Sequence, residues 1–294
     1  MAGFQLREAC PVCHSRESTA LCDLSWDDPG LSAFIDSFYQ GRVPAGALTS
    51  GRYRVVTCRH CTFVYQDWIL DDEGMLALYR DWVDQARSLQ KKQQAGANLF
   101  RQYAGQLQTL ARVLDGPPAS VRILDFGMGW GYWCRMAQAH GYKVSGFELS
   151  PERREHARGM GLEVIDSLDG FDGHFDYIHA NQVFEHLPDP ADSLQLLRRC
   201  LKPGGIIGLR VPDGRGVAQQ LRQAGWSPTL DAIHPLEHIN CFTRATLLRL
   251  AKTAGLRPFD PPLRLNWGSV LGGIRREISD RWFNTHLMLR RDAD

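Results

Sequence analysis

Four cysteines near the start of the chain are spaced as two pairs that suit a metal ion. Cys10 and Cys13 form the first pair, and Cys58 and Cys61 form the second. Two residues separate the thiols of each pair, so both thiols can lie on one side of a tight turn. Two such turns supply the four sulfur ligands that a tetrahedral zinc ion prefers. Since four protein ligands leave no open coordination position, we predict a structural zinc ion; packing without a metal and redox-active pairs are the alternatives.

A second group of informative residues follows an apolar run and forms a glycine-rich turn. The segment reads Ile123-Leu-Asp125-Phe-Gly127-Met-Gly129-Trp-Gly131, which is typical of a strand that ends in a turn and opens a helix. Glycines at such a turn let the backbone adopt positive φ angles and approach a ligand closely. The turn is not specific by itself, because several classes of nucleotide-binding protein use one.

Acidic residues at the ends of the next two apolar runs make the pattern more specific. Glu148 lies 17 residues after Gly131 and can accept hydrogen bonds from both hydroxyls of a ribose. The following run ends at Asp166 and Ser167, where an adenine edge can be met. Each acid alone is compatible with an exposed turn carboxylate. Acids in this order at strand ends favour a nucleotide-like ligand, because open α/β sheets bind ligands there.

The elements that must position these groups alternate between strand and helix. Apolar runs at 121–126, 143–149, 162–165, 175–180 and 205–211 predict strands, and residues 286–290 predict one more. Helices are predicted at about 130–140, 151–158, 190–201 and 243–254. This alternation predicts an α/β fold, in which helices cover both faces of a parallel sheet.

The part of the chain before this sheet divides into two further regions. Residues 1–66 form a turn-rich, zinc-binding module with a strand at 52–58, and residues 67–118 form a helical linker or lid. Apolar residues at helical spacing mark the linker; they are Met75, Leu76, Leu78, Tyr79, Trp82, Val83, Leu99, Tyr103, Leu107, Leu110 and Leu114. The Asp115-Gly-Pro-Pro segment ends the last helix, so we predict a third region at 119–294.

Composition limits the class of protein. The chain has 294 residues, 44% of them hydrophobic, and a formal net charge of +1. It contains no apolar run near the roughly 20 residues that span a membrane, and its first residues lack the pattern of an export signal. We therefore expect a cytoplasmic protein, in which disulfides are unfavourable. The near-zero charge argues against a protein whose main partner is a nucleic-acid backbone.

The order of these motifs resembles that of class I S-adenosylmethionine-dependent methyltransferases. The matching segments begin at Asp125, Phe147, Phe175 and Val183, the last being Val183-Phe-Glu-His-Leu-Pro-Asp189, and they are specific in combination. Leu201-Lys-Pro-Gly-Gly205 continues the match, which covers about residues 120–255. The resemblance implies a seven-stranded, Rossmann-like sheet whose last strand is antiparallel.

The same resemblance implies a set of residues that bind S-adenosylmethionine. Gly127 and Gly129 would approach the methionine moiety, while Glu148 would hold the ribose. Asp166 and Ser167 would face the adenine. The complete set is Asp125, Gly127, Gly129, Gly131, Glu148, Leu149, Asp166, Ser167, Asn181 and Gln182, of which the last two would face the sulfonium and the acceptor. Met128 departs from the small or polar residue usual in the family, and we expect its bulk to narrow the methionine pocket.

Histidines are the candidates for removing a proton from the methyl acceptor. Imidazole has a reference pKa of about 6.5 and suits proton transfer at neutral pH. His238 follows the fifth predicted strand, and we expect the adjacent Glu237 carboxylate to raise its pKa. His186 is a secondary candidate, with helix capping as the alternative. For Glu237 and His238, the alternative is a polar network at the entry to the next helix.

A further resemblance concerns the acceptor. A two-knuckle zinc module before this core, with a Glu-His pair before the next helix, is similar to sugar C-methyltransferases. The likeness implies catalytic roles for His238, Glu237 and His186, with Tyr79 a looser match. The chain has Pro235 where that family usually has a tyrosine. We therefore expect a small-molecule acceptor, such as a nucleotide-linked sugar, a glycan or a natural-product intermediate, and leave C-, O- and N-methylation open.

Two other functions are compatible with the same motifs. Some ribosomal or transfer RNA methyltransferases also carry a cysteine-rich module. Six arginines and six acidic residues balance each other within residues 1–66, whereas an RNA-binding module should be clearly basic. The second alternative is a scaffold that binds the cofactor without catalysis. Loss of the cofactor-binding glycines or acids would favour a scaffold, but all of them are present.

Overall fold

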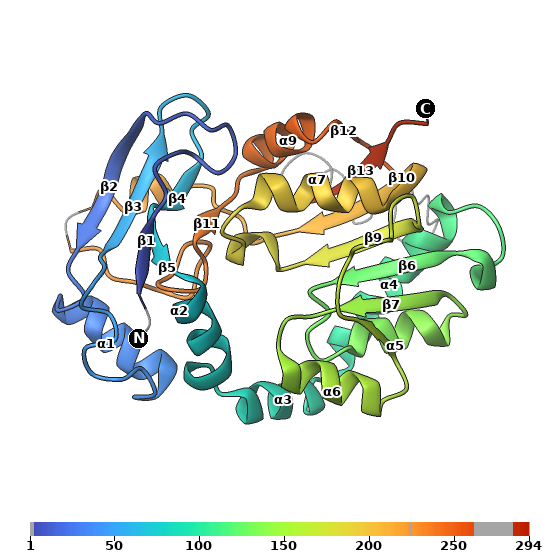
Figure 1. Ribbon diagram of the computed structural model, residues 1–294, viewed down its shortest axis with the longest axis horizontal. Coiled ribbons are helices and arrows are strands. Elements are labelled where there is room, and N and C mark those ends of the chain that lie inside the picture. Colours follow the sequence, from blue (N-terminus) through green and yellow to red (C-terminus); the bar gives the residue numbers. More distant parts are fainter. Residues whose placement is uncertain (1–2, 224, 262–284, 294) are drawn as a thin grey trace, which may run out of the picture. The chain divides into compact units, whose positions relative to one another are not determined.

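The computed structural model describes residues 3–223, 225–261 and 285–293, which form two compact units. Unit 1 comprises residues 1–85, 184–193 and 211–250, and unit 2 comprises residues 86–183, 194–210 and 251–294. Each unit is therefore assembled from segments that are separated in the sequence. The colours of Figure 1 follow the sequence, so the segments of each unit can be traced by their residue numbers.

Unit 2 contains a seven-stranded sheet in the order β12-β13-β10-β9-β6-β7-β8 (Figure 1). Its strands are β6 (Arg122–Phe126), β7 (Lys143–Phe147), β8 (Glu163–Ile165), β9 (Phe175–Asn181), β10 (Leu201–Arg210), β12 (Leu256–Pro258) and β13 (His286–Arg291). Strands β10, β9, β6, β7 and β8 pair in parallel, whereas β13 is antiparallel to both β10 and β12. The predicted seven-stranded α/β sheet with an antiparallel last strand is confirmed.

Helices connect these strands and cover both faces of the sheet. The helices that lie wholly or largely in unit 2 are α3 (Gln85–Gln93), α4 (Ala97–Val113), η2 (Pro118–Ser120), α5 (Tyr132–Ala139), α6 (Pro151–Gly159) and α7 (Pro190–Cys200), of which α3 buries none of its residues. Most of α9 (Arg244–Thr253) belongs to unit 1. The connections β6-α5-β7 and β9-α7-β10 run in opposite directions along the sheet. Because parallel connections are right-handed, α5 and α7 must cover opposite faces. In the part of the chain that the structure describes, no helix combines the length and apolar character needed to cross a membrane.

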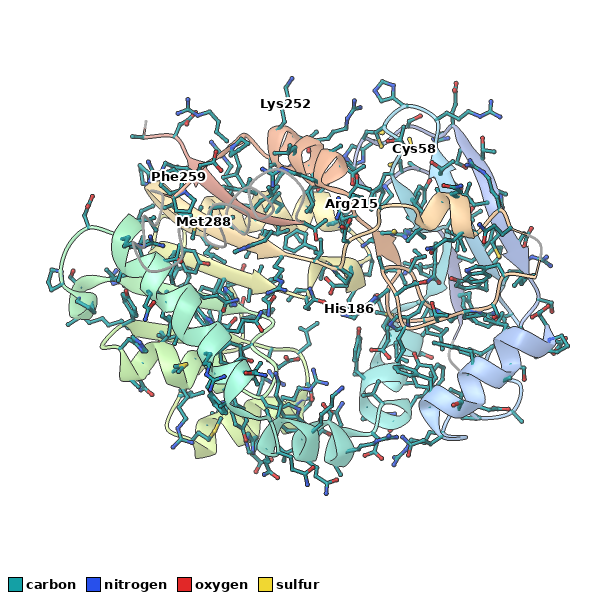
Figure 2. All side chains as sticks on the ribbon, turned by 180° about the vertical axis from the view of Figure 1, so that it is seen from behind. Cys58, His186, Arg215, Lys252, Phe259 and Met288 are labelled. Carbon is teal, nitrogen blue, oxygen red and sulfur yellow. The ribbon has the colours of Figure 1, made fainter. Side chains whose placement is uncertain are left out.

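The stripe predicted on the second half of the linker packs on this sheet. Tyr103, Leu107 and Leu110 of α4 are buried in one cluster with α5 residues such as Trp133. Strand β6 is buried along four of its five residues, as expected for a central strand with both faces covered. Figure 2 labels Phe259 and Met288, where the Phe259 N–H donates to the Met288 carbonyl oxygen at 2.8 Å.

Unit 1 contains a four-stranded antiparallel sheet, in the order β11-β4-β3-β2, and a two-stranded sheet of β1 and β5. Its elements are β1 (Phe4–Leu6), β2 (Ser18–Leu24), α1 (Pro29–Tyr39), β3 (Tyr53–Cys58), β4 (Val64–Gln66), β5 (Trp68–Leu70), α2 (Asp72–Ala77), η1 (Leu78–Trp82), η3 (Phe184–His186), α8 (Val217–Gln220) and β11 (Asn240–Cys241). Strand β3 confirms the strand predicted at 52–58. The division at residues 66 and 118 stays a prediction.

Buried and half-buried polar side chains join the three segments of unit 1. The Arg7 guanidinium donates to the carbonyl oxygens of Gln66, Pro188 and Ile239 and to Oδ1 of Asn240. Asn240 Nδ2 in turn donates to two carbonyl oxygens of the 184–193 segment. The Gln66 side chain donates to the carbonyl oxygens of residues 234 and 238 at 2.9 and 3.0 Å. These bonds fix the loop before β11 against the N-terminal strands.

The core of unit 2 provides a first test of the fold. Leu107 is 1% exposed and packs between α4 and the sheet. We expect Leu107→Ala to lower the free energy of unfolding by about 2–5 kcal/mol, because it removes buried methyl groups and leaves a cavity. Urea denaturation followed by circular dichroism measures the loss. Gln102→Ala, on the exposed side of the same helix, should change the free energy of unfolding by at most about 0.5 kcal/mol. Equal losses in both variants would contradict the packing of α4.

Candidate functional site

The glycine-rich turn lies at the carboxyl end of β6 and adopts the backbone that its sequence predicts. Gly127, Gly129 and Gly131 have φ angles of 74°, 56° and 76°. A Cβ atom at Gly127 would lie 2.5 Å from Cγ2 of Val183, so this glycine is required by packing. A Cβ atom at Gly129 would have nothing within 4 Å. The turn is therefore closed on one side and accessible at Gly129, where a ligand can approach the backbone.

Glu148 follows β7 and is held rigidly beside this turn. Its Oε2 accepts the Gly129 N–H at 2.9 Å, and its Oε1 accepts the N–H groups of Leu149 and Ser150 at 2.9 and 3.0 Å. An ionised carboxylate offers about four acceptor positions, so both oxygens retain capacity for further donors. The Leu149 side chain is 75% exposed, which is unusual for a leucine in a strand-end turn. Glu148 therefore provides fixed hydrogen-bond acceptors, and Leu149 provides an exposed apolar surface next to them.

The third predicted acid has a different local environment. Asp166 Oδ1 is paired with Arg154 and Arg158 of α6 at 2.9 and 2.8 Å. Ser167 Oγ donates to Asp169 at 2.7 Å. Both side chains are thus engaged by neighbours within unit 2, and their role toward an adenine stays a prediction.

Asp125 and Met128 are buried in unit 2. Burial raises the pKa of Asp125 to about 7, although its hydrogen bond from the Cys134 thiol, at 3.2 Å, acts in the opposite direction. Met128 is 6% exposed and packs against β7, since a Cβ atom at Gly146 would lie 2.1 Å from its sulfur. The expectation that Met128 narrows a ligand pocket is wrong, because its side chain instead fills the core beside a strand glycine.

Asn181 and Gln182 complete the row at the carboxyl ends of the strands. Asn181 is the last residue of β9, and Gln182 follows it with a φ angle of 58°. The Gln182 N–H donates to the Arg210 carbonyl oxygen at 2.8 Å, which holds this uncommon conformation. Left-handed backbone at a residue other than glycine is enriched at functional sites. Unit 2 therefore gathers the glycine turn, Glu148, Leu149, Asn181 and Gln182 at one edge of its sheet.

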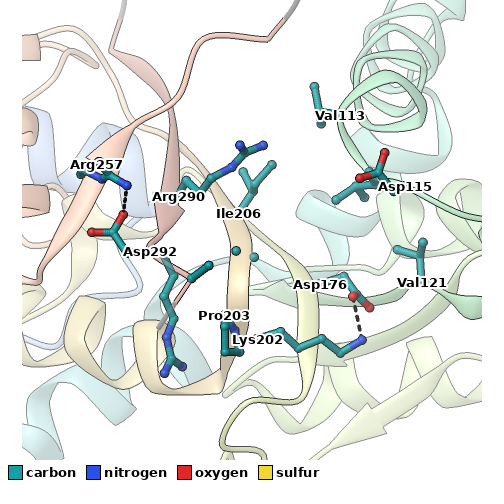
Figure 3. A pocket seen from close by; sticks show the side chains of 15 residues that line it. Val113, Asp115, Val121, Asp176, Lys202, Pro203, Ile206, Arg257, Arg290 and Asp292 are labelled. Atoms are coloured by element: carbon teal, nitrogen blue, oxygen red, sulfur yellow. Dashed lines mark hydrogen bonds and ion pairs between the residues drawn. The ribbon is translucent and has the colours of Figure 1, made fainter.

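A hollow of about 500 Å³ lies at the opposite, amino ends of the strands (Figure 3). Its charged lining is largely paired: Lys202 contacts Asp176 at 2.6 Å, and Arg257 forms an ion pair with Asp292. Ligands of open α/β sheets bind at the carboxyl ends. This hollow is therefore distinct from the edge that carries Gly129 and Glu148.

Unit 1 brings together the histidines predicted to act on the acceptor. The rings of His186 and His238 have centroids 4.9 Å apart, and the Tyr79 ring lies 6.4 Å from that of His186. Nδ1 of His186 bonds to the Glu237 carbonyl oxygen at 2.9 Å, and Nδ1 of His238 bonds to the Asp231 carbonyl oxygen at 2.8 Å. A carbonyl oxygen only accepts, so each Nδ1 carries the proton. Each neutral ring therefore has its lone pair on Nε2.

The electrostatics of this cluster differ from the sequence-based expectation. Burial lowers the pKa of His238, although the hydrogen bond to Asp231 opposes this effect. The predicted increase in the pKa of His238 is wrong, because burial has the larger effect and lowers it. Oε1 of Glu237 accepts the Tyr39 hydroxyl at 3.0 Å. Burial also lowers the pKa of His234 to about 3, and its ring centroid lies 4.0 Å from that of His238.

Two residues of this cluster were missed by the sequence analysis. Tyr39 lies 198 positions before Glu237, so no local pattern connects them. Glu185 lies in a motif that was recognised, but it was given no role. Its side chain is completely buried, and neither carboxylate oxygen has a hydrogen-bond partner among the described residues. Burial raises the pKa of Glu185 to about 8. The position of Glu185 directly after the apolar residues Val183 and Phe184 was the feature of the sequence that could have indicated a buried acid.

The four predicted cysteine ligands converge in unit 1, near the end of β3 where Figure 2 labels Cys58. Their sulfur atoms all lie within 4.8 Å of one another, with Cys10–Cys61 and Cys13–Cys58 separations of 3.5 Å. Tetrahedral bonds of about 2.3 Å place sulfur ligands roughly 3.8 Å apart, so the cluster fits a zinc-sized ion.

The two cysteine turns have the same backbone shape. The His14 N–H donates to the Cys10 carbonyl oxygen at 2.8 Å, and the Thr62 N–H donates to the Cys58 carbonyl oxygen at 3.0 Å. His14 and Thr62 follow the second cysteine of their pairs, with positive φ angles of 59° and 62°. This repeated turn directs both thiols of a pair to one side, as the spacing predicts.

Comparisons with known proteins identify relatives of the larger part of the chain. A family described as "Methyltransferase domain" matches residues 93–259. The ubiquinone biosynthesis O-methyltransferase of Thiobacillus denitrificans is 28% identical over 153 residues, covering 48% of this chain and 66% of that protein. The 2-methyl-6-phytyl-1,4-hydroquinone methyltransferase of a Synechocystis species is 31% identical over 104 residues, covering 32% of this chain and 33% of that protein. The matches thus span two thirds or less of these relatives.

A solved S-adenosylmethionine-dependent methyltransferase from Mesorhizobium loti is also similar to the chain. Its sequence identity is 18%, and the TM-score is 0.44. The similarity covers 64% of this chain and 96% of that structure.

Proposed function

The chain belongs to the methyltransferase domain family, and on that premise we propose that it transfers the methyl group of S-adenosylmethionine to a small molecule. The observation that carries the proposal is the edge of unit 2 at which Gly129 is open to a ligand and Glu148 is fixed beside it. This is the edge at which open α/β sheets bind ligands.

The residues of this edge can recognise each part of the cofactor. Glu148 would accept the two ribose hydroxyls, because its three backbone hydrogen bonds already hold both oxygens in place. The exposed Leu149 side chain would cover one face of the adenine. Gly127 and Gly129 would let the methionine moiety approach the backbone. When bound, S-adenosylmethionine supplies a methyl group on a positively charged sulfur atom, which is neutral after transfer.

We propose that the acceptor is a hydroxyl-bearing or keto-bearing small molecule, with a sugar as the preferred class. The resemblance to sugar C-methyltransferases supports this class. By their names, one relative above is an O-methyltransferase of ubiquinone biosynthesis and the other methylates a hydroquinone, so both are compatible with a small-molecule acceptor. Transfer to an alcohol or a carbon requires that the acceptor lose a proton. A positioned base contributes to such reactions, and unit 1 offers imidazoles in the required tautomer.

His238 is the proposed base, supported by His186, Glu237 and Tyr79. Because Nδ1 of His238 donates to Asp231, Nε2 is the atom that can accept the proton as the acceptor forms its bond to the methyl group. His186 has the same tautomer, so it can take a secondary role. The Tyr39 hydroxyl holds the Glu237 carboxylate through the 3.0 Å hydrogen bond. Glu237 would therefore orient the acceptor rather than charge the imidazole.

We also propose that Cys10, Cys13, Cys58 and Cys61 bind one structural zinc ion. The converging sulfur atoms and the two matching turns support it. With four thiolates as ligands, the ion has no position for a substrate. Its role would be to hold the first strands of unit 1, which carry Arg7 and Gln66.

The zinc proposal predicts a metal requirement for folding. Protein dialysed against metal-free buffer should retain one zinc ion per chain by elemental analysis. Cys58→Ser should lose that ion and aggregate, since metal binding and folding are coupled in such modules. Cys200→Ser, at a buried cysteine in unit 2, should retain the ion. Metal-free protein with an intact unit 1, as judged by hydrogen exchange, would contradict the proposal.

The cofactor proposal predicts a loss of affinity in Glu148→Ala. The variant should bind S-adenosylmethionine more weakly by about 1–3 kcal/mol, the range for hydrogen bonds to a charged group. Isothermal titration calorimetry measures the change. Glu163→Ala, at an exposed position of β8, should bind as the parent protein does. Unchanged affinity in Glu148→Ala would show that the cofactor lies elsewhere.

The base proposal predicts that His238→Ala keeps cofactor affinity and loses turnover. The rate should fall about 100- to 10,000-fold, the usual contribution of a general base. Glu237→Gln should lose less, because it retains a polar group near Tyr39. Turnover is measured on a panel of nucleotide-linked sugars and phenols. Near-normal turnover in His238→Ala would remove the base assignment, and cofactor binding without turnover on any acceptor would favour a scaffold.

A further inference from the structure

Glu185, His186 and His238 of unit 1 form a cluster that neither the cofactor nor the zinc module uses. Each offers one ligand atom, and these atoms all lie within 4.8 Å of one another. Glu185 and His186 belong to η3, whereas His238 comes from the loop before β11. We propose that this cluster binds a second divalent transition-metal ion, held by two imidazole nitrogens and one carboxylate.

The tautomers of both histidines suit metal binding. Each Nδ1–H donates to a backbone carbonyl oxygen, of Glu237 for His186 and of Asp231 for His238. In metal sites, the ring nitrogen that does not bind the ion almost always makes a hydrogen bond of this kind. It fixes the ring and leaves the Nε2 lone pair for the metal. The arrangement comes from backbone groups, so it does not depend on side-chain partners that can move away.

Glu185 provides the second, independent reason. Its side chain is completely buried, and neither oxygen has a hydrogen-bond partner among the described residues. The nearest cationic candidate is Nε2 of His186, 3.9 Å from Oε1. A buried carboxylate is costly unless it is paired or coordinates a metal. A divalent ion would supply the opposite charge and accept a lone pair from a carboxylate oxygen, so it accounts for a group that the protein leaves unsatisfied.

The spacing of the ligand atoms fits the ion after small adjustments. Metal–nitrogen and metal–oxygen bonds of about 2.0–2.2 Å place tetrahedral ligands roughly 3.4 Å apart. Atoms now up to 4.8 Å apart would therefore move together by about 1.4 Å at most, within reach of side-chain rotation. Two imidazoles and a carboxylate suit zinc, cobalt, nickel or iron rather than magnesium or calcium. Three protein ligands leave the fourth position to water.

The ion would compete with the proposed base, and this consequence rests on the proposed function. Nε2 of His238 carries one lone pair, which cannot bind a metal and accept a proton at the same time. The loaded cluster would therefore be unable to deprotonate an acceptor through His238. Metal occupancy would act as an inhibitory control on methyl transfer, because it removes the proposed base.

The test measures binding without an acceptor. The protein, with its zinc retained, is titrated with Co²⁺ by calorimetry, and the metals are counted after gel filtration. We expect one zinc and one cobalt per chain, without the near-ultraviolet absorption of cobalt–thiolate bonds. Glu185→Gln and His238→Gln should weaken cobalt binding by about 100-fold or more, since loss of a supporting partner alone costs 10- to 100-fold.

His140→Gln is the matched control. His140 also bonds through Nδ1 to a backbone carbonyl oxygen, at 2.8 Å, but it is exposed and lies outside the cluster. If His140→Gln reduces the uptake of a second ion as strongly as Glu185→Gln does, the ion binds to surface histidines. This result would overturn the proposal. Absence of a second ion at millimolar cobalt would overturn it as well. If Glu185→Gln fails to fold by circular dichroism, His238→Gln alone decides. If the metal proposal fails in either way, the proposal of methyl transfer still stands, because turnover is measured separately with cofactor and acceptor.

Discussion

Unit 1 depends on one set of buried hydrogen bonds, those that Arg7, Gln66 and Asn240 make to backbone carbonyl oxygens. The unit is built from three segments of the chain, which no local interaction can bring together. Arg7 donates to a carbonyl oxygen in each of these segments, at Gln66, Pro188 and Ile239. Gln66 holds the loop that carries His234 and His238. A buried donor without its acceptor costs about 1–3 kcal/mol, so these bonds specify one arrangement of the loop.

The same hydrogen bonds join the cysteine module to the loop that carries the histidines. Strand β4, which follows the second cysteine pair, pairs with β11 immediately after His238. Helix α1, inserted between the two cysteine pairs, supplies the Tyr39 hydroxyl to Glu237. The N-terminal residues therefore form part of the environment of the histidines. The module behaves as a structural support for a chemical cluster in the same unit, and its balanced charge is consistent with that role.

Buried charge is handled differently in the two units. In unit 2, Asp125 is buried beside a thiol that donates to it, and Glu148 is satisfied by three backbone N–H groups. In unit 1, Glu185 has no such donor among the described residues. A carboxylate in an apolar environment holds a proton or attracts a cation, because the charged form is poorly solvated there. Glu148 therefore has backbone donors at both oxygens and Arg153 at 3.9 Å, whereas the His186 ring, also at 3.9 Å, is the ion-pair candidate for Glu185.

The sequence by itself predicted most strands of unit 2 and two groups of residues that lie together in the structure. Alternating apolar runs predicted the strands and helices, and the order of Gly129, Glu148 and Asn181 placed them at one edge, because parallel strands align their carboxyl ends. The cysteine spacing predicted a cluster because two residues between thiols form a tight turn. Only the tertiary structure decided that Met128 faces the core, that Asp166 pairs with α6, and that the Tyr39 hydroxyl donates to Glu237. These outcomes depend on packing between segments far apart in the chain, and periodicity reports only which face of its own element a residue occupies.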